Sequence, residues 1–174
     1  MLKNANDQGL LPYIALALFA GLRSAELMRL DGKDVNFEER AVVVGQQVAK
    51  KRSRRVVEMC DALYAWLIPL KPLKGAIVDT REFPDNLDAL KGAAEIESWP
   101  HNGLRHSFGS YHLAFRGDAV KTAQQMGHRS SDVVHNHYKA LVLKTDAEKF
   151  WSLKPEQKPP PSQPSTELEG LATQ

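Results

Sequence analysis

The chain has 174 residues, of which 43% are hydrophobic and 25% are charged, and its net charge is only +2. This composition is typical of a globular protein of one ordinary domain, and it excludes a strongly basic protein whose charge alone would indicate nucleic-acid binding. The single Cys60 excludes a disulfide framework and a cysteine-based zinc site. The longest apolar run, residues 10–22, is too short to span a bilayer. We therefore expect a cytoplasmic protein with no membrane contact.

The first predicted elements are two helices separated by a glycine. Residues 11–20 form an apolar helix that ends before Gly21, a residue suited to a C-terminal cap. A second helix is predicted over residues 24–30, with Ser24 as its cap. Arg23 then lies at the start of this helix, where free backbone N–H groups and the helix dipole favour an anion.

A β-hairpin is predicted next, after a turn-like stretch over residues 31–40. Residues 41–49 and 55–59 are rich in valine, and Lys50 falls near the tip between them. The link KKRSRR, residues 50–55, holds five of the chain's 23 lysines and arginines. Such a cluster on a nearly neutral chain indicates phosphate contacts, although a solvated hairpin tip would also explain it.

Helices dominate the remainder of the chain. The first covers residues 61–70, with Asp61 as its cap and Pro69 at its end. Five more are predicted over residues 83–97, 102–115, 117–127, 130–141 and 144–153. The predicted fold is therefore mainly α with a small antiparallel β-sheet (α+β), in one domain over residues 1–154. Residues 155–174 are rich in Pro, Gln and Ser and are expected to form a disordered tail.

The histidines are crowded, which would suit a metal, a proton-transfer or a phosphate site. Residues 99–112 hold three of the six together with Arg105, and the others are His128, His135 and His137. On a helix, residues two apart point about 200° apart, so His135 and His137 could not bind one ion. No acidic residue stands at a zinc-enzyme spacing from them. We therefore expect no metal and no cofactor.

A phosphate site fits the positive side chains better. Four potential donors to one anion are spread along the chain: Arg23, Lys50, Arg105 and His128. Guanidinium groups bind phosphate oxygens in bidentate fashion and stay charged at neutral pH. Each residue alone is also explained as a surface ion-pair partner. Their occurrence together with a tyrosine favours the phosphate.

Five short motifs carry these residues in a fixed order. They are FAGLRSAEL (19–27), AKKRSRRVVEM (49–59), NGLRHSFGSYH (102–112), MGHRSS (126–131) and HNHY (135–138). The chain resembles the catalytic domain of the tyrosine recombinases, the phage-type integrases, whose first arginine, lysine, second arginine, Gly-His and tyrosine boxes these motifs match. Each motif is weak by itself, but five in order over residues 10–150 is a specific signal.

The resemblance implies a mechanism. Tyr138 would attack a DNA phosphodiester, form a covalent 3′-phosphotyrosine and release a 5′-hydroxyl. Arg23, Arg105 and His128 would stabilise the charge on the phosphoryl oxygens in the transition state. Lys50 would protonate the leaving oxygen. Because the phosphotyrosine keeps the bond energy, rejoining needs neither ATP nor a metal ion.

Double-stranded DNA is the partner that the resemblance implies. Further backbone contacts are expected from basic residues in and beside the motifs: Lys51, Arg52, Arg54, Arg55 and Arg129. Glu26 would orient an arginine or the adjacent backbone, or it is a surface acid of its helix. The segment after Tyr138, with Phe150 and Trp151, is expected to dock on a neighbouring subunit of a homo-oligomer or on its own domain.

One position departs from the family pattern. A histidine usually stands three residues before the second arginine, and here that place holds Asn102, with His101 beside it. An amide cannot take a proton from the tyrosine hydroxyl. Either Asn102 keeps an orienting hydrogen bond and caps its helix, which we favour, or His101 reaches the phosphate. We assign His106 and His112 to supporting or packing positions.

Length is a second departure. Only nine residues precede the first predicted helix, so we expect the N-terminal DNA-clamping domain of such recombinases to be absent and the chain to be a fragment or a truncated gene product. DNA binding should then be weaker. The predicted function is site-specific recombination or integration. Two alternatives remain open, a DNA-binding remnant of a mobile element that does not cut and an enzyme similar to the type IB topoisomerases.

Overall fold

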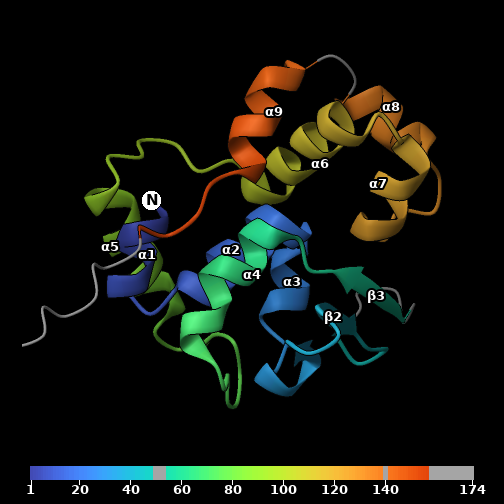
Figure 1. Cartoon of the computed structure of the whole chain (residues 1–174). Coiled ribbons are helices and arrows are strands. Elements are labelled where there is room, and N and C mark those ends of the chain that lie inside the picture. Colours follow the sequence, from blue (N-terminus) through green and yellow to red (C-terminus); the bar gives the residue numbers. More distant parts are fainter. Residues whose placement is uncertain (49–53, 139–140, 157–174) are drawn as a thin grey trace, which may run out of the picture.

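The computed structural model describes residues 1–48, 54–138 and 141–156 (Figure 1). Helices form most of it, and a small antiparallel sheet completes it, so the predicted fold class is confirmed. In chain order the elements are α1 (Leu2–Asp7), α2 (Leu11–Ala20), α3 (Ser24–Leu27), η1 (Gly32–Asp34), β1 (Val35–Asn36), β2 (Ala41–Val44), β3 (Arg55–Glu58), α4 (Asp61–Leu67), η2 (Ile68–Leu70), α5 (Phe83–Ala93), α6 (Gly103–Arg116), α7 (Ala119–Met126), α8 (Asp132–Tyr138) and α9 (Lys144–Trp151).

The sheet has the strand order β1-β2-β3, and both pairings are antiparallel. The predicted hairpin is confirmed, but β2 is shorter than expected because the chain turns after Val44. Val42 pairs with Val57 and both are buried, so one face of the sheet adds to the core. The tip, with residues 49–53, lies outside the described residues. Strand β1 was not predicted, since two residues give no alternation to recognise.

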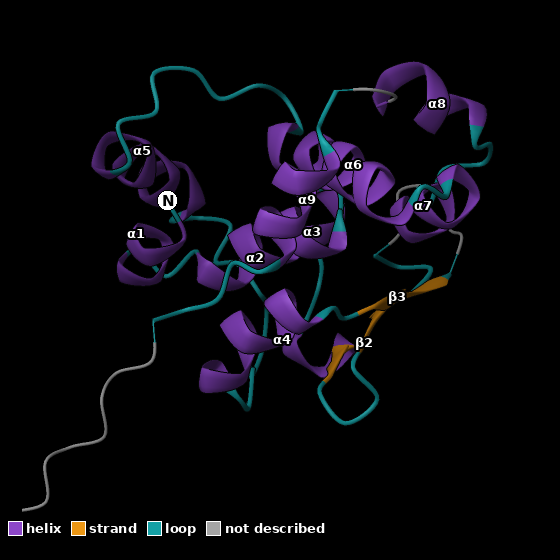
Figure 2. Cartoon of the chain, turned by 45° about the horizontal axis from the view of Figure 1, so that its top comes forward, coloured by secondary structure: helices purple, strands orange, loops and turns teal. Residues whose placement is uncertain are grey.

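Helix α2 lies at the centre of the core. It is buried on all sides, with Ile14 and Leu16 fully inaccessible, and it packs against α1, α4 and α6 (Figure 2). A helix that is apolar all round belongs inside a protein. Gly21 ends it with a left-handed φ of 63°, as predicted. A side chain there would also collide with the ring of Phe108, so this glycine lets α6 approach the end of α2.

Helices α6 to α9 gather on one side of the molecule, and strand β3 lies beside α7 (Figures 1 and 2). A second apolar cluster joins α6, α7 and α8 through Phe108, Met126, Val134 and Tyr138. Helix α9 packs on α6, where Phe150 stacks on Tyr111 with ring centroids 4.2 Å apart. Of the two predicted docking places for this segment, the structure therefore shows the one on its own domain.

The expected caps at two helix starts are wrong. Arg23, not Ser24, is the N-cap residue of α3, and the carboxylate of Glu26 accepts from its backbone N–H at 2.9 Å. The cap of α4 is Cys60, whose Sγ accepts from the backbone N–H of Leu63 at 3.5 Å. In each case the predicted cap residue lies one position inside the helix, where its own side chain no longer faces the free N–H groups.

Some boundaries also differ from expectation. Helix α1 occupies residues that were expected to precede the first helix, and it buries Ala5. Helix α3 ends at Leu27 rather than residue 30, because Leu30 turns to accept from the backbone N–H of Ile77 at 3.0 Å. Within the described residues, no helix is long and apolar enough to cross a membrane. Residues 157–174, most of the predicted tail, lie outside the described residues.

Candidate active site

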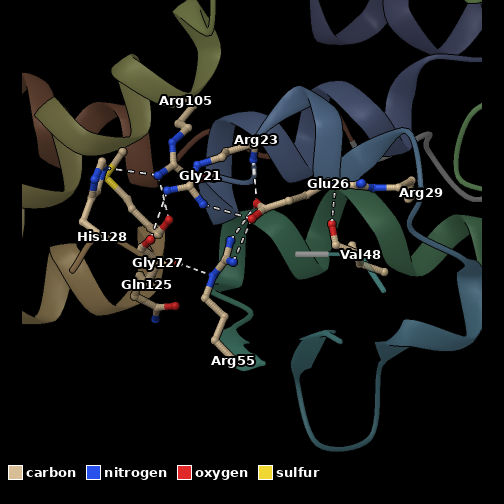
Figure 3. A network of polar contacts seen from close by, with 11 residues as sticks. Gly21, Arg23, Glu26, Arg29, Val48, Arg55, Arg105, Gln125, Gly127 and His128 are labelled. Carbon is tan, nitrogen blue, oxygen red and sulfur yellow. Dashed lines mark hydrogen bonds and ion pairs between the residues drawn. The ribbon is translucent and has the colours of Figure 1, made fainter. Parts of the chain in front are cut away.

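Glu26 is the centre of a polar network at the start of α3 (Figure 3). It stands three residues after Arg23 and is completely buried, so the alternative of a surface acid is wrong. Its carboxylate accepts from the backbone N–H of Arg23 and, at 3.0 Å, from the Arg23 guanidinium. Because Arg23 has extended backbone angles just before a helix, both its N–H and its side chain face the carboxylate one turn later.

Arg55 completes this network from strand β3. Its guanidinium binds both oxygens of Glu26 at 2.9 and 2.8 Å, and its Nε donates to the carbonyl of Gln125 at 3.1 Å. Burial opposes ionisation of Glu26, but the hydrogen bonds and charges of Arg55 and Arg23 outweigh it and lower the pKa of Glu26 to about 2. The bidentate pair therefore ties the hairpin to α3 and to the end of α7.

Arg105 reaches the same region from the first turn of α6. It is buried, and its guanidinium donates to the carbonyls of Gly21 and, at 2.6 Å, of Met126. Burial first, and then the charge of Arg23, lower the pKa of Arg105 to about 9, still well above neutral pH. Arg23, Arg55 and Arg105 thus form an arginine cluster with three positive charges around one buried carboxylate. Arg105 is buried and the other two are partly exposed, and such an excess of positive charge in a partly desolvated place favours binding of an anion.

His128 stands at the edge of the arginine cluster. Gly127 ends α7 in the left-handed conformation, with φ 66°, and its carbonyl accepts from Arg23 at 3.0 Å. The next residue, His128, is half-buried, with Nε2 3.2 Å from a guanidinium nitrogen of Arg105. Burial and the charges of Arg105 and Arg23 lower the pKa of His128 to about 4. It is therefore neutral in the free protein, and a bound anion would raise its pKa.

Tyr138 lies at the last position of α8, with its ring against α6. It is buried, and a Cβ on Gly109 would lie only 2.9 Å from the Tyr138 ring, so this glycine makes the close packing possible. The hydroxyl is 2.9 Å from Nδ1 of His106. Burial raises the pKa of Tyr138, while the charges of Arg105 and Arg23 act in the opposite direction. The hydroxyl is thus protonated at neutral pH and lies within the field of the arginine cluster.

An open groove of about 720 Å³ runs from the arginine cluster along the sheet. Arg23, Arg55 and His128 line its inner part, and the exposed Lys121 and Arg129 stand along it. The acidic Glu39 and Glu58 and the basic Arg40 also line the groove, and basic residues outnumber acidic ones in its lining. The groove gives an extended anion a path to the cluster.

The predicted site residues fall into three groups. The fold brings together Arg23, Arg105, His128 and Tyr138, with the buried Glu26 next to Arg23. Lys50, Lys51 and Arg52 lie outside the described residues. Arg54 is exposed next to β3, and Arg129 is exposed on the groove. Arg55 lines the groove, but its guanidinium is 12% exposed and bound to Glu26, so the expected DNA contact of this residue stays a prediction.

The asparagine that replaces the usual histidine has a different setting from the one expected. Asn102 is the N-cap residue of α6, but it has a left-handed φ of 55° and its side chain accepts no capping hydrogen bond. It lines a small cavity with Tyr13 and Ser24. His101 is exposed. The residue beside the tyrosine hydroxyl is His106, whose position was taken for a supporting one, and the signal that could have indicated this contact is Gly109 one turn further along α6.

Among residues 1–48, 54–138 and 141–156, no group of three His, Cys, Asp or Glu side chains is placed to hold an ion. Helices α6 and α8 carry four histidines, and not all of them lie near Tyr138. His112, for example, is buried with Nδ1 2.8 Å from the hydroxyl of Thr122.

A helical domain with a small sheet, a buried arginine cluster and a tyrosine packed beside it defines the class of tyrosine recombinase catalytic domains. The model of the phage integrase family matches residues 2–143, and the chain belongs to this family. No curated protein matches the chain.

Solved structures of recombinases and integrases have a similar fold. The fold is similar to that of XerA recombinase, with a TM-score of 0.62 and 21% identity, covering 85% of this chain and 58% of that one. It is also similar to the Tn1549 transposon integrase in complex with a circular intermediate DNA, with a TM-score of 0.54, 20% identity, and coverage of 82% and 58%. The same integrase with transposon right end DNA gives a TM-score of 0.53, 19% identity, and coverage of 80% and 56%. The chain therefore spans less than two thirds of these proteins, and the likeness concerns the fold.

Proposed function

We propose that the chain breaks and rejoins DNA strands in site-specific recombination, with Tyr138 as the nucleophile. The observation that carries this proposal is the arginine cluster, in which Arg23 and Arg55 bind the carboxylate of Glu26 and Arg105 adds a third guanidinium group. An anion would balance the remaining charge, and the charges of Arg105 and Arg23 act to lower the pKa of the Tyr138 hydroxyl, which favours its ionised form.

The anion is the scissile phosphate of duplex DNA. Arg23 and Arg105 bind its non-bridging oxygens and stabilise the charge that builds up in the transition state. His128 is neutral before binding, gains a proton or donates its ring N–H as the phosphate arrives, and adds to this stabilisation. Tyr138 displaces the 5′ oxygen and forms a 3′-phosphotyrosine, and a free 5′-hydroxyl later reverses the step.

Lys50 is proposed as the acid that protonates the leaving 5′ oxygen. Its support is the resemblance, together with the position of the strands that flank it. Arg55, five residues further on, pairs with Val44 across the hairpin and is bound to Glu26 beside Arg23. The link between these strands therefore starts and ends close to the arginine cluster.

DNA is the proposed partner, and the groove beside α7 is the proposed path of its backbone. Lys121 and Arg129 stand along that groove, and Arg54 stands at the base of the hairpin link. The Tn1549 integrase structures that share this fold are complexes with DNA. A homo-oligomer on DNA is also proposed, with Leu141 and Leu143 as contact residues because they are 65% and 71% exposed just before α9.

The experiment is a covalent-adduct assay. A duplex nicked near the cut site loses a short fragment on cleavage, so the protein stays attached to the DNA and migrates slowly on a denaturing gel. The substrates are taken from DNA on either side of the coding sequence. The wild-type protein should give this band, and Tyr138→Phe should not, while both bind the duplex in a gel shift.

The second candidate function is DNA binding without cleavage, and Asn102 favours it because an amide supplies no base. It predicts a gel shift and no covalent band from the wild-type protein. Absence of both the shift and the band would contradict the two candidates together.

A further inference from the structure

The hydroxyl of Tyr138 has one side-chain partner among the described residues, and it is His106. The two rings have centroids 5.7 Å apart and are tilted by 42°, and Nδ1 of His106 lies 2.9 Å from the hydroxyl oxygen. Packing fixes this geometry, because the Tyr138 ring rests on Gly109, one turn after His106 on the same helix face. The contact is thus built into the packing of α8 on α6.

Asn102 is not placed to compete for this role. It lies one turn before His106, it is the left-handed residue that precedes α6, and it lines the small cavity near Tyr13 and Ser24. Among the hydrogen bonds of the described residues, none joins Asn102 to Tyr138. An amide in that place also lacks a lone pair basic enough to accept a proton.

We propose that His106 is a catalytic residue, the base that accepts the proton of the Tyr138 hydroxyl during attack on the phosphate. This inference rests on the proposed function. The Oη–H bond of Tyr138 breaks and its proton moves to Nδ1 of His106, while an Oη lone pair forms the bond to phosphorus. The bond from phosphorus to the 5′ oxygen breaks, and that oxygen is protonated by the general acid proposed above. In the rejoining step, the imidazolium returns its proton to Oη.

The surroundings of His106 suit a base. Burial first, then the charge of Arg105 and the neighbouring His137 and His101, lower the pKa of His106. The imidazole is therefore neutral at pH 7, which leaves a lone pair on Nδ1 when the hydrogen is on Nε2. Its side chain is exposed, so the second nitrogen has access to water. The bound phosphate would then stabilise the imidazolium that forms.

The test measures the single-turnover rate of covalent adduct formation on the nicked substrate, from about pH 5 to about pH 8. Wild type should become faster as the pH rises through the pKa of His106 and then level off. His106→Ala and His106→Gln should form adduct about 10²- to 10⁴-fold more slowly and lose this rise. Added imidazole should restore part of the rate of His106→Ala. The matched control is His135→Gln on α8, an exposed histidine outside the site, which should keep the wild-type profile.

A second substrate separates the base from the acid. When sulfur replaces the bridging 5′ oxygen, the leaving thiolate needs no proton. This substrate should rescue Lys50→Ala but leave His106→Ala slow. If both variants are rescued alike, His106 assists the leaving group and the proposal is overturned.

A third measurement needs no DNA. The ¹⁵N shifts of the His106 ring should show the hydrogen on Nε2, and Tyr138→Phe should change them. A hydrogen resident on Nδ1 would overturn the proposal, because that nitrogen could not accept. If wild type forms the adduct and the His106 variants form it at the same rate, this inference is overturned and the proposed function still stands. Absence of adduct from wild type would overturn the proposed function and this step with it.

Discussion

The two halves of the candidate site are held in different ways. The arginine cluster is tied by several hydrogen bonds among α3, β3 and α7, and its carboxylate is completely buried. The proposed nucleophile, Tyr138, is held by apolar packing and by one contact to His106. The proposed phosphate-binding part is therefore formed in the free protein, whereas the tyrosine can be moved at the cost of one hydrogen bond and some packing. We therefore expect mutations to affect duplex binding and formation of the covalent adduct differently.

Removing the carboxylate of Glu26 should have the largest effect on the stability of the fold. Glu26→Ala leaves the partly buried guanidinium groups of Arg23 and Arg55 without their counter-charge, which is expected to destabilise the fold by about 3–5 kcal/mol. Urea denaturation followed by circular dichroism measures this. A loss below about 1 kcal/mol would contradict a central role for the carboxylate.

The ionisation of Glu26 should also make the free energy of unfolding depend on pH. The pKa of Glu26 is about 2 in the folded chain against a usual value of 4.5, so its contribution is fully present above about pH 4.5 and is lost as the pH falls towards 2. The difference in unfolding free energy between wild type and Glu26→Gln should therefore shrink when the pH is lowered from 7 to 3. A difference that is constant over this range would show that the ionised carboxylate does not stabilise the fold.

Arg55→Lys should have the next largest effect. A lysine keeps the charge but loses the paired hydrogen bonds to Glu26 and the bond to Gln125, so we expect a loss of about 2 kcal/mol and slower adduct formation through a displaced hairpin. Arg54→Lys is the matched control, because Arg54 is its exposed neighbour, and it should leave stability unchanged. Equal effects of the two substitutions on stability would favour the original expectation that Arg55 contacts DNA.

Gly109→Ala tests the close packing of the Tyr138 ring on α6. The added methyl would lie 2.9 Å from the Tyr138 ring, so the ring must shift, at a cost of about 1–3 kcal/mol. Adduct formation should fall while duplex binding stays close to that of wild type, since the arginine cluster is not touched. Gly92→Ala on α5, where nothing lies within 4 Å of the new methyl, is the control and should change neither property. Equal loss of binding and cleavage would show that the two halves are coupled.

Contacts could be predicted from the sequence only where the two residues lie close together along the chain. The relation of Arg23 to Glu26 is local, three residues within one helical turn, and was predictable from helix geometry. The partners of Arg55 lie 29 and 70 positions away, so the sequence indicated only its basic character, and its bonds to Glu26 and Gln125 are seen only in the folded chain. The same holds for His106, which is 32 positions from Tyr138 and meets it only because α8 rests on Gly109. The fold class needed no such contacts, since apolar helices and a valine-rich hairpin are local patterns.

Tyr138→Phe should have the smallest effect on stability. It removes one hydroxyl and its contact to His106, and the ring still fills its place on Gly109. The expected loss is about 0.5–1.5 kcal/mol, small beside that of Glu26→Ala, although the covalent adduct disappears completely. Denaturation and the adduct assay on the same preparation measure both. A large loss of stability from this substitution would mean that the tyrosine, like the carboxylate, is a fixed part of the structure, and the difference between the two halves of the site would no longer hold.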